Sequence, residues 1–476
     1  MSEPDFLARL DPLSELPALA GYANTKNIII TAIETTGRLD ADALKLAVKQ
    51  ASEKYPQIRC CIQEVRARGR FHLLRQPRPD LETPVFFTDL PESDTEAPTL
   101  DRLLNFLAPR LDRDWDLFNE LPAEFHFVRV SPERHILAPV IHHVAADAGI
   151  AAELGRECLL NYHRIVTGTE PQLVGETPGI STSAKRRVRT RRSWWKGLAS
   201  DARGVVSALF EHPTLPVGSS SPDDQREHHV KRVFSVEDTA MIARLSRVKA
   251  GALVDLLAVC ANLAVDQWNQ ARNEPPGMLT TTVSVNMRGR YREIRAANNS
   301  GQLFFRSMPE ERADPAAFAR SLAMQRISQF RRQMDFKFFQ DVSRLTKAVS
   351  VLPFHLRRRL VHFLMERHQF SVAMTVLGVI WPAFKNGKPT SDTSLTRVGD
   401  LTIEEVHGIG YKLLSATRLL FIVYTFRNRL NLVLAASGNL FTRQEADQFM
   451  DLVLVNLFRT LEIVGNPTAT DSHSKK

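Results

Sequence analysis

The chain has 476 residues, of which 43% are hydrophobic, and a formal net charge of +9. This length exceeds one ordinary hydrophobic core, so we expect two domains or a pseudo-duplicated pair. The apolar runs, such as residues 419–423, are as short as strands, which excludes membrane-spanning helices. The acidic start lacks a signal peptide and the four cysteines lack metal-ligand spacing, so the sequence predicts a reduced cytoplasmic protein.

Strand and helix patterns are mixed in residues 1–168, which form the first predicted half. Strands are expected at 27–35, 58–62, 71–74, 124–130 and 134–141, and helices at 40–54 and 100–111. The two short strands at 58–62 and 71–74 are expected to pair with each other.

Residues 169–229 are rich in Pro, Gly, Ser and charge, which predicts a linker or surface crossover. Within it, residues 185–196 hold seven basic and no acidic side chains. Without this stretch the chain is close to neutral, so the high net charge is mostly local.

This basic stretch has several interpretations. It can be a solvated crossover between the two halves. It can also contact an anionic membrane through residues 185–210, because Trp194 and Trp195 precede an apolar series beside the cations. An acyl carrier protein or a CoA phosphate would use the same charge differently. Nucleic-acid binding is disfavoured, because no recognised module accompanies the patch.

Mixed strand and helix patterns resume in residues 230–476, the second predicted half. Strands are expected at 228–234, 280–287, 370–379, 419–424 and 431–437, and helices at 236–248, 254–270, 315–334, 354–367 and 442–464. The helix at 354–367 has one basic and one apolar face. Two mixed α/β halves joined by a long crossover are therefore predicted.

The most informative segment is His142-His143-Val144-Ala145-Ala146-Asp147. It follows the predicted strand 134–141, and Ile150 and Leu154 then recur at helical spacing, with Asp147 placed as an N-cap. The histidines therefore lie in a strand-to-helix corner. Because neighbouring side chains of an extended segment point to opposite faces, the two should have different roles.

This segment resembles the His-His-x-x-x-Asp motif of the CoA-dependent acyltransferase superfamily, which includes chloramphenicol acetyltransferase, the condensation domains of nonribosomal peptide synthetases and the wax ester synthases. Weaker resemblances extend over nearly the whole chain, at 55–59, 121–122, 285–288, 299–305 and 375–378. The family resemblance implies two chloramphenicol-acetyltransferase-like α/β sandwich halves that form a V, with His143 near the middle of a central tunnel.

The resemblance also implies roles for individual residues. His143 would be the general base, and Asp147 a structural residue paired with an arginine, for which Arg288 is the candidate. His142 would be a packed, supporting histidine, and Thr375 would lie near the oxyanion. A metal site made by the two histidines and Asp147 is disfavoured, because adjacent histidines diverge and no further ligand cluster accompanies them.

The function implied is transfer of an acyl group from a thioester donor to a hydroxyl or amine acceptor. Acyl-CoA or a phosphopantetheinyl carrier protein would be the co-substrate, with no bound cofactor. A histidine with a pKa of about 6.5 suits general-base work near neutral pH. The Trp-containing segment and the 26 phenylalanines favour a hydrophobic or lipid-like component, as in lipid or secondary-metabolite biosynthesis.

Three positions depart from the family pattern and support an alternative. Ala148 stands where the motif has Gly, and Val254 and Val376 stand where two later elements have Asn. A stand-alone condensation-type protein that serves as a non-catalytic carrier-protein scaffold is therefore the competing hypothesis.

Overall fold

The computed structural model describes nine stretches of the chain. They are residues 9–21, 25–90, 99–173, 212–219, 227–288, 298–367, 369–386, 388–412 and 418–461. The predicted linker is described only at 169–173, 212–219 and 227–229, and the basic stretch with its proposed membrane contact at 185–210 lies outside the described residues.

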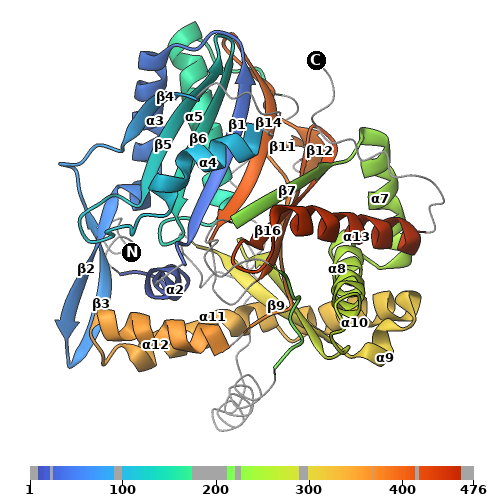
Figure 1. The fold of residues 1–476 in the computed structure, drawn as a ribbon. Coiled ribbons are helices and arrows are strands. Elements are labelled where there is room, and N and C mark those ends of the chain that lie inside the picture. The colour runs from blue at the N-terminus through green and yellow to red at the C-terminus, as the bar shows by residue number, and fades with distance from the viewer. Residues whose placement is uncertain are drawn as a thin grey trace.

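The first of two large sheets has six strands (Figure 1). In spatial order they are β13 (Arg397–Val398), β14 (Leu401–Tyr411), β1 (Ile28–Thr36), β6 (Arg134–His142), β5 (Ala123–Ser131) and β4 (Val85–Asp89). Helices α3 (Ala41–Lys54) and α5 (Ala148–Thr167) cover one face, and α4 (Thr99–Leu111) covers the other.

The sequence of β1 explains why helices cover both faces of this sheet. Ile29 and Ile33 pack in the core below α3 and α5, whereas Ile28, Ile30 and Ala32 pack in the core below α4. A strand that is buried on both faces is apolar without alternation, as the run of isoleucines in β1 is.

The second sheet also has six strands. They are β7 (Glu227–Val233), β16 (Arg429–Ser437), β15 (Leu419–Phe426), β10 (Val372–Val379), β8 (Leu279–Asn286) and β9 (Ser300–Ser307). Its core is shared with α7 (Val236–Lys249), α8 (Leu253–Gln270), α10 (Pro315–Arg331) and α13 (Arg443–Leu461). The predicted mixed α/β arrangement around two cores is confirmed.

The two sheets do not follow the two sequence halves strictly. β14 comes late in the chain, yet it pairs antiparallel with β1 along its full length and completes the first sheet. A small hairpin, β11 (Pro382–Lys385) and β12 (Lys388–Thr393), precedes it.

A third group of elements lies beside the first sheet (Figure 1). It consists of α2 (Pro12–Ala20), the turn η1 (Pro56–Arg59), the hairpin β2 (Cys60–Ala67) and β3 (Arg70–Pro77), α11 (Met334–Val349) and α12 (Phe354–Arg367). The short helix α9 (Pro309–Arg312) lies apart from this group and adjoins α10. The predicted pairing of the two short strands is confirmed by the register of β2 and β3.

Among the described residues, no single helix is long and apolar enough to cross a membrane; α7 and α8 pass that test only as a pair bent by 86°. All four cysteines are buried free thiols.

A buried polar cluster joins the two sheets. His407 Nε2 in β14 lies 2.8 Å from Glu34 Oε1 in β1, and His407 Nδ1 lies 3.0 Å from Lys231 Nζ in β7. Lys231 also donates to Glu405 at 2.7 Å. Burial raises the pKa of Glu34, but the hydrogen bond from His407 and the charges of His407 and Lys231 outweigh it and lower the pKa to about 2.

We expect Glu34→Gln to reduce stability at neutral pH but not in acid. Because the folded-state pKa is below the unfolded value, the stabilisation is present above about pH 4.5 and disappears as the pH falls towards 2. The full shift corresponds to about 3 kcal/mol. Urea unfolding of both proteins at several pH values measures the difference, and a difference that stays constant from pH 7 to pH 3 would contradict this assignment.

Candidate active site

The two histidines lie where β6 passes into α5. The backbone N–H of His142 donates to the Pro122 carbonyl at 2.8 Å, and that of His143 donates to the Asn27 carbonyl at 2.7 Å. These bonds hold the end of β6 between its two neighbouring strand segments. The side chains of the two histidines then diverge into different surroundings.

His142 is a buried, neutral histidine. Its Nδ1 accepts a hydrogen bond from the Val144 N–H at 3.1 Å, which leaves the proton on Nε2. The ring makes an edge contact with Trp115, with centroids 6.2 Å apart. Burial lowers the pKa of His142 to about 3, with smaller contributions from His143 when that ring is protonated and from the positive charge of Arg358.

His143 is partly exposed and meets a residue from the other part of the chain. Its Nδ1 lies 2.8 Å from Nδ2 of Asn298, and the same amide group donates to the Leu13 carbonyl at 3.1 Å. Burial lowers the pKa of His143, whereas the Asp147 charge and the backbone carbonyls of His143 and Ala146 raise it in part. The net lowering keeps the imidazole neutral near pH 7.

Asp147 is the N-cap of α5 and an ion-pair partner of Arg288. Its carboxylate accepts from the Ile150 N–H at 3.0 Å, the Asn299 N–H at 2.8 Å and Arg288 Nη2 at 2.7 and 2.6 Å. Arg288 lies two residues after the end of the second-sheet strand β8, so this contact joins the histidine corner to the second half of the chain.

The geometry around Gly149 explains how the corner tolerates Ala148. A Cβ on Gly149 would lie 2.9 Å from Nη1 of Arg288, so a side chain here would collide with the ion pair. Ala148 is the first residue of α5 and has a negative φ, a conformation that alanine adopts freely. The close approach therefore needs a glycine at 149 rather than at 148.

The other sequence-predicted positions lie in the second sheet and its helices. Thr375 is in β10, and its hydroxyl donates to Ser284 Oγ at 3.3 Å rather than to a group of the corner. Val376 packs against the second core. Asp255, beside Val254, forms a buried ion pair with Arg326 at 2.8 and 2.9 Å, which joins α8 to α10.

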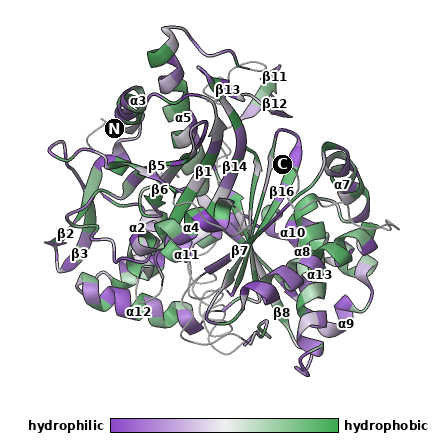
Figure 2. Cartoon of the chain, turned by 45° about the horizontal axis from the view of Figure 1, so that its top comes forward, coloured by the Kyte–Doolittle hydropathy of each residue, from purple (hydrophilic) through white to green (hydrophobic). Residues whose placement is uncertain are grey.

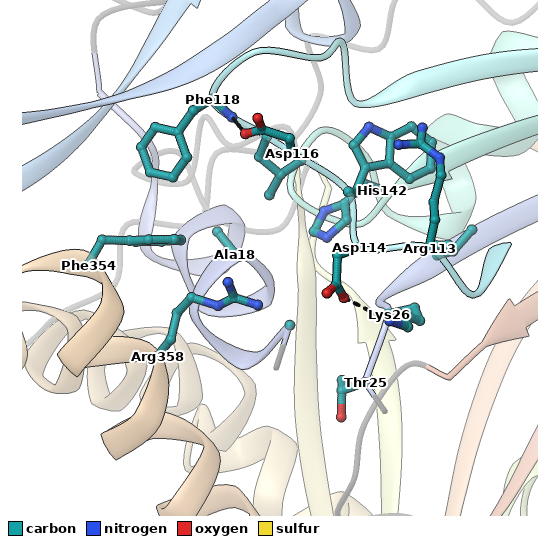
Figure 3. Close-up of a pocket in the computed structure, with 14 residues that line it drawn as sticks. Ala18, Thr25, Lys26, Arg113, Asp114, Asp116, Phe118, His142, Phe354 and Arg358 are labelled. Carbon is teal, nitrogen blue, oxygen red and sulfur yellow. Dashed lines mark hydrogen bonds and ion pairs between the residues drawn. The ribbon is translucent and has the colours of Figure 1, made fainter. Parts of the chain in front are cut away.

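A cavity of about 240 Å³ opens beside the corner, on the side of His142 (Figure 3). Phe118 and Phe354 meet there edge to face, with centroids 5.0 Å apart. Lys26 pairs with Asp114 at 2.8 Å across the same space. The polar wall consists of Thr25, Lys26, Arg113, Asp114, Asp116, His142 and Arg358. Helix α12 thus contributes both an aromatic ring and a cation to the cavity.

The sequence did not reveal Asn298 as part of this site. It is 3% exposed and lies just before β9, far from His143 in the chain. The adjacent pair Asn298-Asn299, at the start of the segment 299–305 that resembles the family, was the available signal, since two amides in a buried loop need partners. Within the described stretches, no group of three or more His, Cys, Asp or Glu could hold a metal ion.

A match to a protein-family model identifies the family of this chain. The model of the condensation domain matches residues 24–279, which include β1, the histidine corner and α8. The chain belongs to the condensation-domain family.

Curated relatives match shorter parts of this family member. It is 29% identical over 157 residues to the nonribosomal peptide synthetase CymA of Salinispora arenicola, which is 33% of this chain and 2% of that protein. It is 26% identical over 140 residues to the isonitrile lipopeptide synthase of Mycobacterium tuberculosis, which is 29% of this chain and 5% of that protein. The matched part thus covers a small fraction of both relatives.

Solved structures match nearly the whole chain. The trichothecene 15-O-acetyltransferase TRI3 of Fusarium sporotrichioides has a TM-score of 0.65 at 10% identity, over 95% of this chain and 94% of that one. The predicted fold class, two chloramphenicol-acetyltransferase-like halves, and the predicted membership of the acyltransferase and condensation superfamily are therefore confirmed.

Proposed function

We propose that this condensation-family protein transfers an acyl group from a thioester donor to an amine or hydroxyl acceptor, with His143 as general base. The proposal rests on the contact between the strand-to-helix corner that holds the histidines and the second half of the chain. A neutral His143 lies at the end of β6, and Asp147, four residues later, binds Arg288 from the other half. An ion pair that joins the two halves beside the histidine fixes its position relative to both.

In this mechanism the imidazole of His143 takes the acceptor's proton as the acceptor's oxygen or nitrogen attacks the thioester carbonyl. The C–S bond of the resulting tetrahedral intermediate then breaks, and the thiolate takes a proton from the imidazolium. The base must therefore be neutral before attack, which its lowered pKa supports. His142 is the supporting histidine, because its Nδ1 is engaged by the Val144 N–H. Thr375 is proposed to lie near the oxyanion that forms on the thioester carbonyl.

Both acceptor classes have support among the similar proteins. CymA and the lipopeptide synthase are peptide-forming by name, and TRI3 is an O-acetyltransferase by name. The aromatic pair Phe118 and Phe354 at the cavity favours an apolar substrate group.

The test is release of free thiol from acyl-CoAs of increasing chain length and from acyl carrier proteins, each with mixed amine and alcohol acceptors. We expect acceptor-dependent thiol release and a new ester or amide by mass spectrometry. Silence with both donor classes would favour the non-catalytic scaffold.

Asn298 gives the proposal a pH-dependent prediction. In the native protein the acid limb of kcat/KM should lie below pH 6.5, because burial lowers the pKa of His143. Asn298→Asp places a carboxylate where an amide lies 2.8 Å from Nδ1, which favours the imidazolium. We expect the acid limb to move up by about one pH unit or more. The uncharged Asn298→Ala should not move it upward, and an unmoved limb in Asn298→Asp would refute the contact.

A further inference from the structure

Helix α12 presents an exposed apolar stripe on the outside of the molecule. Leu356, Leu360 and Phe363 are 39%, 36% and 48% exposed, and Val351 just before the helix is 53% exposed. The three helical positions are four and three residues apart, so they lie on one face. Figure 2 shows hydrophilic and hydrophobic segments side by side along α12.

The opposite face of α12 is fixed to the protein. Arg357 is fully buried and donates to Glu15 in α2 at 2.9 Å and to Glu64 in β2 at 2.8 Å. Val361, on the same inner face, is also fully buried. The helix is therefore a rigid support, and its outer stripe is not a core face displaced into solvent.

Cations surround this apolar stripe. The tip of the β2–β3 hairpin lies against the end of α11, a few residues before α12, because Arg70 Nη1 donates to the Lys347 carbonyl at 2.6 Å and the Phe71 N–H to the Ser350 carbonyl at 2.6 Å. Arg367 lies over the ring of Phe363 at 4.6 Å. The exposed cations of this surface are Arg66, Arg68, Arg70, Lys347, Arg359 and Arg367.

We infer that this surface, α12 with the tip of the β2–β3 hairpin, binds the surface of an anionic lipid membrane. A helix with large apolar side chains on one face and arginines beside them is typical of a helix that lies in the membrane interface. Its apolar residues enter the acyl boundary while the arginines reach lipid phosphates. Glu366 is the exposed carboxylate on α12, and it lies 3.1 Å from His362, so the charge of the surface complements an anionic bilayer.

The position of α12 relates this surface to the cavity. Phe354 and Arg358, on its inner side, line the cavity next to His142 (Figure 3). A membrane on the outer side would lie about one helix diameter, roughly 10 Å, from that space. A lipid-soluble substrate could then pass from the bilayer along α12, although membrane binding itself does not depend on the proposed acyl transfer.

The experiment is flotation of the full chain with vesicles of phosphatidylcholine, with and without phosphatidylserine. We expect binding only to the anionic vesicles. Leu360→Asp and Phe363→Asp should each weaken it by about tenfold or more, since each removes the burial of one large apolar side chain. Arg359→Glu should weaken it by about fivefold or more, at roughly 1 kcal/mol per cation near the surface.

Val248→Asp, at a 75% exposed position on α7, is the matched control and should bind normally. All four variants should keep thiol release from a short water-soluble donor, which separates a failure of the membrane inference from a failure of the proposed function. The inference is overturned if the native chain binds neither vesicle, or if deleting residues 185–196 abolishes binding while the α12 variants do not. The inference is also overturned if the α12 variants lose binding to an acidic carrier protein but still bind the vesicles.

Discussion

His143→Ala should lower kcat/KM for acyl transfer by about 10²- to 10⁴-fold, the usual contribution of a positioned general base. Its side chain is partly exposed and hydrogen-bonds to the side chain of Asn298. The thermal midpoint should therefore change little. Thiol release with the best donor, measured together with thermal unfolding, checks both parts of this expectation.

Two histidine variants serve as controls for this result. His163→Ala removes the same side chain about 24 Å further along α5, and it should keep native activity. His142→Ala should lower the thermal midpoint more than His143→Ala does, because His142 is 3% exposed and packs against Trp115. A His143→Ala protein that transfers acyl groups as fast as the native protein would exclude the general-base role.

The histidine corner could be predicted because its determinants are local. The strand before it, the N-cap and the helical spacing after it lie within about two dozen residues. β6 has nearly the predicted bounds, and α5 begins directly after the predicted N-cap Asp147. Local periodicity also predicted β1, β5 and β6 of the first sheet and every strand of the second sheet except β9. Arg288, 141 positions from Asp147, came only from the family resemblance, since a single sequence carries no information on such a long-range contact.

Two of the features that escaped prediction, the strand β14 and Asn298, did so for a shared physical reason. The strand β14 contains Glu404, Glu405 and His407, a composition typical of the surface, and it is central because Lys231 and Glu34 satisfy its buried charges. Asn298 was missed because an amide has no distinctive sequence pattern and its role depends on an imidazole from the other half. In both cases the buried residues are polar, and their partners come from distant segments of the chain.

Arg288→Ala should destabilise the protein by about 3 kcal/mol, because it leaves the Asp147 carboxylate buried without its cation. Asp147 is 2% exposed, so water cannot replace the guanidinium well. The two backbone N–H groups that it accepts from remain. The corner should also loosen, so kcat should fall together with stability. Urea unfolding and thiol release measure the two effects.

A second change should rescue part of this loss if the buried charge is its cause. Asp147→Asn removes the charge but keeps an oxygen that can cap α5, since Asn and Asp are equally good N-caps. Adding it to Arg288→Ala should restore about 1–2 kcal/mol of the lost stability, the penalty of an unpaired buried charge. In the native background, the same Asp147→Asn should instead destabilise, because Arg288 loses its partner. If the losses of the two single variants simply add in the double variant, the ion pair contributes nothing and N-capping alone explains Asp147.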